Sequence, residues 1–282
     1  MSEVLADDGI TIHYDAFGRQ DGPPLLMLQG LGTDARGWAL QRLAFGRRYR
    51  CIAPDNRGVG RTGPVPGPYS LDRMAFDALS VLDAEGIKSA HVIGASMGGI
   101  IAQILAVLHP DRVNGLVLAC TACSHHEWRR ELLTEWADAV EAGGIGALGD
   151  EALEWLIGPR LRKRFGIWLN LGARIVVQQD PDAFINQIHA ILDAPDELRH
   201  ELVHLNVPTL VITGSQDSLT PVGDAEELAE LISSSRLEVL GGAAHGLMLE
   251  APIAFNQAVL TFLGEVDDLE SAAKNRHRAT SA

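Results

Sequence analysis

Cysteine is scarce in this chain, and its pattern excludes several kinds of site. The 282 residues include three cysteines, of which Cys51 and Cys120 lie in apolar runs typical of small buried side chains. Cys120 and Cys123 have C-x-x-C spacing, but no second pair completes a zinc site. With no second cysteine pair, no metal ion is expected. An odd number of cysteines fits a reducing compartment, and we expect a cytoplasmic protein.

Basic residues and long apolar runs are also in short supply. The chain has 23 Lys and Arg residues against 37 Asp and Glu residues, a formal net charge of −14, which argues against nucleic acid or an anionic membrane as a partner. Residues 1–8 have neither the basic nor the apolar region of a signal peptide. No run approaches the roughly 18 apolar residues of a membrane-spanning helix. Because 46% of the residues are apolar, the chain can still bury a sizeable core.

Strand and helix patterns alternate along most of the chain. Short continuous apolar runs are typical of strands buried on both faces, and their alternation with helices of ten or more residues indicates βαβ units. The sequence therefore predicts an α/β fold with a mostly parallel, doubly wound sheet. Strands are expected at residues 10–15, 24–29, 50–53, 90–93, 115–120, 208–213 and 236–240. Helices are expected at residues 34–45, 70–85, 97–108, 221–232 and 253–262.

The alternation stops between residues 121 and 204. This stretch shows helical periodicity without a strand pattern, and a helical insertion between two sheet strands would lie above the strand ends, where open α/β sheets bind ligands. We therefore expect a helical cap. It contains four of the five tryptophans, namely Trp128, Trp136, Trp155 and Trp168. Most of these are expected to hold the cap helices together, whereas one or two, Trp128 first, would contact the substrate.

These patterns divide the chain into a core, a cap and a tail. Residues 1–120 and 205–264 are expected to form the α/β core, and residues 121–204 the cap. Apolar residues disappear after Leu269, so residues 265–282 are predicted to form a flexible tail.

The most informative segment is the one around Ser96. An apolar run at residues 91–93 leads into Gly94-Ala95-Ser96-Met97-Gly98 and then into a helical pattern. A G-x-S-x-G motif between a strand and a helix is a nucleophile elbow, a strained turn whose close neighbours must lack side chains. The turn holds the serine hydroxyl at the carboxyl end of the strand, beneath the positive end of the helix. Ser96 is therefore the predicted nucleophile.

A serine nucleophile needs a general base, and that base needs a third group to orient it. Asp217 follows the strand pattern at 208–213 in a loop before a helix, and His245 lies in the Gly/Ala-rich loop after residues 236–240. Each residue alone also has an ordinary structural explanation, because Asp is common in turns and the chain has ten histidines. Together, the order Ser96, Asp217, His245 is the one expected for a nucleophile elbow of this kind.

The reaction of such a serine also needs donors for the negative charge of the tetrahedral intermediate. One donor should be the backbone N–H of Met97, the residue after the nucleophile. The other is expected in the loop at residues 30–34. There we favour the Leu31 N–H, because Gly30 and Gly32 let the backbone approach a substrate closely. Gly30 is accordingly expected to contact the substrate.

The Gly-rich run at residues 55–62 could suggest a phosphate-binding loop. It has neither the full G-x-x-x-x-G-K-[ST] pattern nor G-x-G-x-x-G. We expect instead an Asp–Arg brace that shapes the loop beside the active site.

With these elements placed, the chain closely resembles the α/β-hydrolase family from about Val4 to Gly264. The motifs that carry the resemblance are the D-x-R-G-x-G run from Asp55, the G-x-x-D-x-x-T-P run from Gly214, and the segments 244–246 and 250–252. The resemblance implies that Ser96 is the nucleophile, that His245 acts first as base and then as acid, and that Asp217 orients His245.

This sequence departs at two places from patterns found in the family, and these departures narrow the range of reactions expected of it. The haloalkane dehalogenase and epoxide hydrolase branches have aspartate at the position of Ser96, so those reactions are disfavoured. Gln29-Gly30 replaces the common His-Gly pair of the first loop. The enol-lactonase branch departs there too, and its loop is similar to residues 31–34 followed by Trp38, which implies Trp38 as a substrate contact. The longer Gly/Pro-rich loop usual in the C–C bond hydrolase branch is absent.

The sequence therefore predicts a serine hydrolase that cleaves a small to medium carboxylic ester, including a lactone, without a cofactor. The same residues could support C–C bond cleavage or perhydrolase chemistry, or a ligand receptor with residual hydrolase activity. The partner is expected to be a small molecule, with no nucleic acid or membrane partner. The oligomeric state cannot be derived from the sequence.

Overall fold

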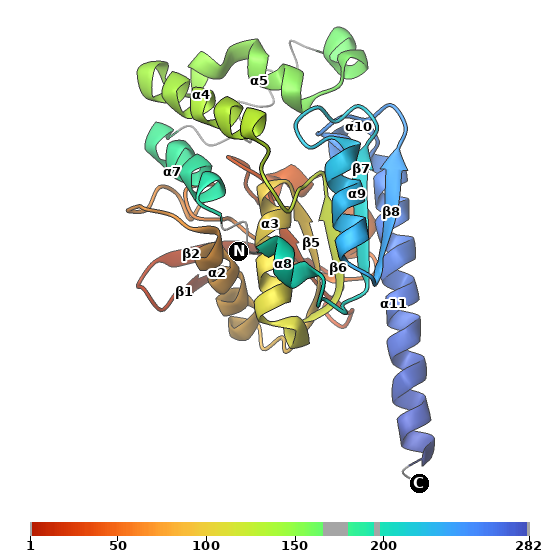
Figure 1. Cartoon of the computed structure of the whole chain (residues 1–282). Coiled ribbons are helices and arrows are strands. Elements are labelled where there is room, and N and C mark those ends of the chain that lie inside the picture. Colours follow the sequence, from red (N-terminus) through yellow and green to blue (C-terminus); the bar gives the residue numbers. More distant parts are fainter. Residues whose placement is uncertain (1, 166–179, 195–197, 281–282) are drawn as a thin grey trace.

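A mostly parallel sheet organises the molecule (Figure 1). The computed structural model describes residues 2–165, 180–194 and 198–280. Within them, eight strands pair in the order β1-β2-β4-β3-β5-β6-β7-β8, antiparallel at β1–β2 and β2–β4 and parallel at the other pairs. The strands are β1 (Ser2–Leu5), β2 (Thr11–Gly18), β3 (Pro24–Leu28), β4 (Arg50–Pro54), β5 (Ala90–Ala95), β6 (Val113–Ala119), β7 (Thr209–Gly214) and β8 (Ser235–Leu240). The predicted doubly wound α/β sheet is confirmed.

Helices cover both faces of this sheet. The helices are α1 (Arg42–Gly46), α2 (Leu71–Ala84), α3 (Met97–Leu108), α4 (Glu127–Gly143), α5 (Gly149–Leu156), α7 (Pro181–Leu192), α8 (Leu198–Leu202), α9 (Val222–Leu231), α10 (Leu247–Glu250) and α11 (Pro252–Thr280). Short 3-10 helices are η1 (Ala35–Trp38), η2 (Pro110–Arg112) and η3 (Ile145–Leu148). Helices α2, α3, α8 and α9 lie on one face, and α1 and α11 lie on the other (Figure 1).

The core has two apolar clusters, one on each face of the sheet, because side chains alternate between the faces along each strand. Leu26 and Val92 point into the apolar cluster under α2 and α3, whereas their neighbours Leu25 and Ile93 point into the cluster under α1 and α11. Because successive side chains of a strand face opposite sides, a strand covered on both faces must be apolar at nearly every position. This is why β3, β4, β5 and β7 could be recognised as continuous apolar runs.

Helices α4, α5 and α7, all from the stretch expected to form the cap, lie beyond one end of the sheet (Figure 1). Backbone bonds connect this region to the loop after β8, since the Gly246 N–H donates to the Leu156 carbonyl over 2.7 Å. Trp136 is buried in the core, while Trp128 and Trp155 stack with ring centres 5.8 Å apart. Trp168 lies outside the described residues.

The helix expected at residues 34–45 is two shorter elements, η1 and α1. The Asp34 carboxylate accepts a hydrogen bond from the Arg36 N–H over 2.8 Å and so caps a 3-10 turn. Residues 39–41 then redirect the chain before α1 begins at Arg42. A local side-chain bond of this kind competes with regular helix hydrogen bonding, and periodicity alone does not reveal it.

The expectation of a flexible tail from residue 265 does not hold for its first residues, because α11 continues through the boundary at 264 to Thr280. Val266 is buried, and the Asp267 carboxylate lies 3.0 Å from His91 Nε2 and accepts a bond from the Tyr49 hydroxyl over 3.1 Å. A polar anchor of this kind does not appear as apolar periodicity, so it could not be predicted from the sequence pattern. Among the described residues, every helix is too short or too polar to cross a bilayer.

Candidate active site

Ser96 occupies a strained turn between β5 and α3. Its backbone angles are φ 53° and ψ −120°, a conformation that L-residues rarely adopt and that marks functional sites when the surroundings enforce it. A Cβ atom on Gly94 would lie 2.2 Å from the Gly98 carbonyl oxygen, and one on Gly98 would lie 2.3 Å from the Leu28 carbonyl oxygen. The two glycines of the motif are therefore required by close backbone packing.

Two hydrogen bonds hold this turn in place. The Ser96 N–H donates to the Ala119 carbonyl over 2.9 Å, and the Thr121 hydroxyl donates to the Ser96 carbonyl over 2.8 Å. Both partners come from the end of β6 and the residues after it. The Ser96 side chain is thus fixed at the edge of the sheet where the parallel strands end.

Asp217 and His245 form a buried pair at the same edge. The His245 Nδ1 atom lies 2.9 Å from Asp217 Oδ2 and 3.2 Å from Oδ1. The carboxylate also accepts bonds from the Leu219 and Thr220 N–H groups, at 3.0 and 2.9 Å. Burial alone would raise the pKa of Asp217, but the His245 imidazole and the donors of Thr220 outweigh it, so the pKa lies below its ordinary value.

The loop that carries His245 is held by Glu250 of α10, which also binds the backbone after α5. One oxygen of the Glu250 carboxylate accepts the Ala244 N–H and the Gly158 N–H, each over 3.2 Å. In the described residues, neither the Ser96 hydroxyl nor the His245 Nε2 atom has a protein hydrogen-bond partner. Hydrogen bonds of a free active site are often long and tighten when substrate binds.

The loop after β3 closes on the elbow from the other side. A Cβ atom on Gly30 would lie 3.1 Å from the Ser96 Cβ and 3.7 Å from the Ser96 hydroxyl oxygen. Within the described residues, the N–H groups of Leu31 and Met97 have no hydrogen-bond partner. Met97 is the first residue of α3, where the helix leaves its N–H groups free and its dipole favours negative charge. The arrangement can thus bind an anionic oxygen beside Ser96.

The Asp–Arg brace predicted at residues 55–62 is present. Asp55 Oδ2 accepts the N–H and the Nε–H of Arg61 at 3.0 and 3.3 Å, and Oδ1 accepts the Ala35 N–H at 3.0 Å. The amide of Asn56 donates to the Gln29 carbonyl over 3.2 Å. This loop therefore supports the loop after β3 rather than offering a phosphate site.

Known proteins resemble this chain in sequence and in fold. The profile of the alpha/beta hydrolase fold matches residues 23–142. A 3-oxoadipate enol-lactonase 2 of Acinetobacter baylyi is 31% identical over 262 residues, covering 92% of this chain and 95% of the relative. The chain belongs to the α/β-hydrolase fold family. A putative carbamate hydrolase, RutD, of Azorhizobium caulinodans is also 31% identical and covers 91% and 96%.

A solved structure supports the same assignment. The enol-lactonase from Burkholderia xenovorans superposes with a TM-score of 0.87 at 29% identity, covering 93% of this chain and all of that one. This α/β hydrolase is therefore an enzyme of the hydrolase class that shares the fold of its relatives.

Two predicted substrate contacts of this hydrolase lie in different environments. Trp38 is fully buried, in the apolar cluster under α11, and η1 directs its ring into the core. The substrate-binding role of Trp38 stays a prediction, and its indole Nε1 has no hydrogen-bond partner among the described residues. Trp128 is 36% exposed, stacked on Trp155, and has the Arg129 guanidinium 5.0 Å from its ring centre. Its ring remains available on the cap.

Three polar residues at the site of the hydrolase were not predicted from the sequence. Thr220 donates its hydroxyl to Asp217 Oδ2 over 2.8 Å and lies 3.2 Å from His245 Nδ1. Gln187, from α7, bonds to the loop after β3, and Glu250 holds the His245 loop as described above. The D-x-x-T spacing could have indicated Thr220, whereas nothing in the local sequence distinguishes Gln187 from a solvated glutamine.

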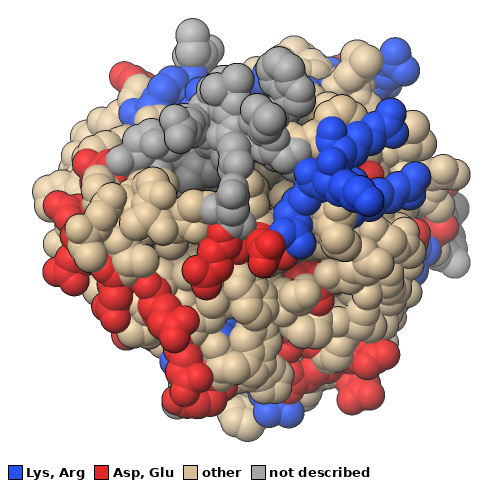
Figure 2. Space-filling view, turned by 90° about the horizontal axis from the view of Figure 1, so that it is seen from above, with Lys and Arg blue, Asp and Glu red and all other residues tan. Residues whose placement is uncertain are grey.

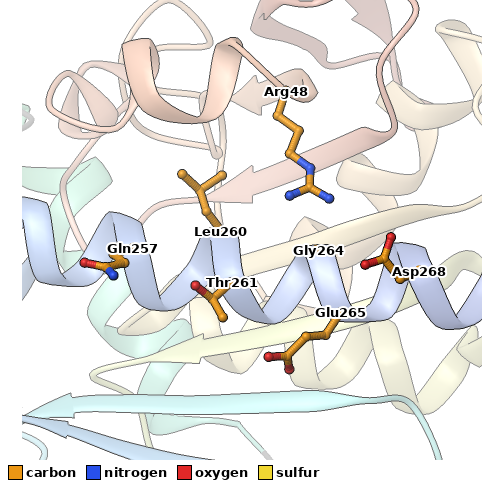
Figure 3. A pocket seen from close by; sticks show the side chains of 7 residues that line it. All are labelled: Arg48, Gln257, Leu260, Thr261, Gly264, Glu265 and Asp268. Carbon is orange, nitrogen blue, oxygen red and sulfur yellow. The ribbon is translucent and has the colours of Figure 1, made fainter.

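Two surface features of the hydrolase are the distribution of its charged side chains and a groove along α11. Seen from the cap side, acidic side chains are spread over much of the face, while Lys and Arg gather in groups (Figure 2). A shallow groove of about 530 Å³ lies along α11, where Arg48 extends over Gly264 (Figure 3). It is separated from Ser96 by the sheet, because α11 covers the opposite face from α3. This groove is not part of the candidate active site.

Proposed function

We propose that this hydrolase cleaves a small to medium carboxylic ester, and in particular a lactone, through an acyl-enzyme on Ser96. The observation that carries the proposal is the Asp217–His245 pair, with 2.9 Å between Oδ2 and Nδ1, at the sheet edge that also holds the strained Ser96. A carboxylate on one imidazole nitrogen leaves the other free to act as a base toward the serine.

In the proposed reaction, Ser96 Oγ attacks the ester carbonyl while His245 Nε2 takes the hydroxyl proton. The carbonyl oxygen becomes an oxyanion that accepts the N–H groups of Leu31 and Met97. Collapse breaks the ester C–O bond, and His245 returns its proton to the leaving alkoxide. In a lactone the ring opens, and the new hydroxyl stays tethered to the acyl-enzyme. Water, activated by His245, then releases the acid.

Two further parts of the proposal concern the substrate pocket. Residues 121–204 act as a cap above the core of residues 1–120 and 205–264, and Trp128 and Gly30 contact the substrate. The low exposure of Asp217 and His245 supports this, since a covered site strengthens the electrostatic interactions inside it.

The lactone preference is supported by relatives named enol-lactonases, one found by sequence and one by structure. Carbamate hydrolysis is the second candidate, because relatives named putative carbamate hydrolases match the chain over the same length. A serine that attacks an ester carbonyl can attack a carbamate carbonyl in the same way.

The decisive experiment is labelling with a fluorophosphonate, read by intact mass and peptide mapping. We expect one label per chain, on Ser96, and none on S96A; a folded wild-type protein that stays unlabelled would overturn the proposal. Initial rates on aryl esters, lactones, carbamates and vinylogous diketones, together with peracid formation, then rank the substrate classes. Faster turnover of carbamates or diketones than of every lactone and ester would refute the ester assignment.

A further inference from the structure

Gln187 joins the cap to two loops of the core. It lies in α7 with its side chain 1% exposed. Its Oε1 atom accepts the Gly32 N–H over 2.8 Å, and its Nε2 donates to the Arg57 carbonyl over 2.6 Å. The loop with Gly32 follows β3, and the loop with Arg57 follows β4. One amide therefore spans both loops, with both of its polar ends satisfied.

These bonds determine which backbone donor remains free beside Ser96. The Gly30 N–H lies 3.3 Å from the Gln29 side-chain oxygen, and the Thr33 N–H donates to the Gly30 carbonyl over 3.2 Å. Gln187 takes the Gly32 N–H. Of the four successive N–H groups at residues 30–33, only that of Leu31 has no acceptor within the described residues.

The other end of the Gln187 bridge is rigid. Arg57 donates through Nε to Asp77 Oδ2 over 2.6 Å and through Nη2 to Asp77 Oδ1 over 2.9 Å, and both side chains are buried. A second carboxylate, that of Asp8, lies 2.7 Å from Arg57 Nη1. The Arg57 carbonyl is thus a fixed point against which Gln187 can hold the Gly32 peptide.

We propose that Gln187 is a positioning residue that holds the loop after β3 so that the Leu31 N–H faces the developing oxyanion. This inference rests on the proposed function of Ser96 and Leu31. Because α7 belongs to the cap, docking of the cap and assembly of the oxyanion site become one event. Displacement of α7 from these two loops would break the Gln187 bridge and remove a transition-state donor.

The test uses Q187M, which is similar in size and cannot form either bond, and Q187N, which is too short to span both loops. N186M is the matched control on α7, since among the described residues the Asn186 side chain hydrogen-bonds within its own helix, to the Asp182 carbonyl at 2.8 Å. For each variant, kcat and KM are measured on an aryl ester, together with the Ki of a trifluoromethyl ketone. This ketone adds reversibly to Ser96 Oγ and forms a tetrahedral oxyanion.

We expect Q187M to lower kcat by about tenfold to a hundredfold. This loss in kcat should not exceed the loss caused by removing a whole oxyanion donor. KM should change by less than about threefold, and the Ki of the ketone should rise by the same factor as kcat/KM falls, because a transition-state interaction is lost. Q187N should lie between Q187M and wild type, and N186M should match wild type. The pH dependence of kcat/KM should be unchanged, since His245 keeps its partners.

A folded Q187M with kcat within twofold of wild type would overturn the inference, as would a loss that appears in KM and leaves the ketone affinity unchanged. If Q187M does not fold, Q187N decides by the same criteria. Absence of Ser96 labelling in wild type removes the proposed function; normal labelling with unaffected Gln187 variants removes only this inference.

Discussion

Thr220 donates its hydroxyl hydrogen to Asp217 Oδ2 over 2.8 Å, at a point where the same oxygen lies 2.9 Å from His245 Nδ1. The threonine thus fixes the carboxylate that in turn fixes the imidazole. Its own N–H donates to the other carboxylate oxygen over 2.9 Å. Asp217 therefore has little freedom to rotate away from His245.

We expect T220V to lower kcat by about 10-fold to 150-fold, because a hydrogen bond to a charged group contributes about 1.5–3 kcal/mol. Steady-state kinetics on an aryl ester measures this. T209V is the matched control, since Thr209 is equally buried and its hydroxyl donates to the Val207 carbonyl, away from Asp217. Equal kinetics for T220V and T209V would refute a role for Thr220 in orienting the carboxylate.

D217N should fold and lose turnover by about two to four orders of magnitude, because an amide no longer holds the imidazole in the required tautomer.

The lowered pKa of Asp217 also predicts how the stability of D217N depends on pH. Its carboxylate stabilises the fold above its unfolded pKa, and this contribution is lost as the pH falls through the folded pKa. Urea unfolding should show a deficit of D217N at pH 7 that shrinks toward pH 3. A pH-independent difference would contradict this.

The three cysteines should be unreactive in the folded enzyme. All are buried, burial raises the pKa of the Cys51 and Cys123 thiols to about 12, and it raises that of Cys120 well above its ordinary value. The thiolate is the reactive form. Titration with Ellman's reagent should therefore find no thiol in the native enzyme and three in guanidinium chloride. A thiol that reacts rapidly in the native enzyme, or inhibition by iodoacetamide, would contradict the prediction that the cysteines are unreactive.

The Arg129–Asp224 ion pair joins α4 to α9, the helix after β7. Both residues are about 97% buried, and Arg129 Nε also donates to the Leu219 carbonyl over 2.8 Å. R129M leaves a buried carboxylate without its main partner, which should destabilise the protein by about 3–5 kcal/mol. The double variant R129M/D224L should be more stable than R129M in urea unfolding. The reverse order would show that the charge of Asp224 is not the source of the loss.

Asp267 should anchor α11 to the sheet. D267A removes the partner of the buried His91 and of the Tyr49 hydroxyl, and each unsatisfied buried group costs about 1–3 kcal/mol. D268A, at the exposed neighbouring position, should change the free energy of unfolding by less than about 0.5 kcal/mol. If the two variants are equally stable, α11 is not held by this contact.

Sequence patterns were informative where one local interaction dominates. The apolar runs of β3 and β5 predicted a buried parallel sheet, and the glycines around Ser96 predicted a turn in which side chains would collide with backbone. Asp217 and His245 could be predicted from their loops after two strands. Their 2.9 Å contact depends on the fold bringing these loops together.

The patterns failed where a long-range polar contact decides the structure. Asp267 looks like a tail residue until His91, far away in the sequence, is seen beside it. Gln187 contacts a residue 155 positions away, and helical periodicity carries no information about such a partner.

The packing of Gly94 and Gly98 against main-chain atoms also limits how this enzyme can be redesigned. Neither position can accept even a methyl group without displacing the Gly98 peptide or the end of β3. A library that randomises both positions should return glycine alone, whatever substrate is selected for. New selectivity would have to be obtained from positions further from these main-chain contacts, and the turn at Ser96 would be kept unchanged.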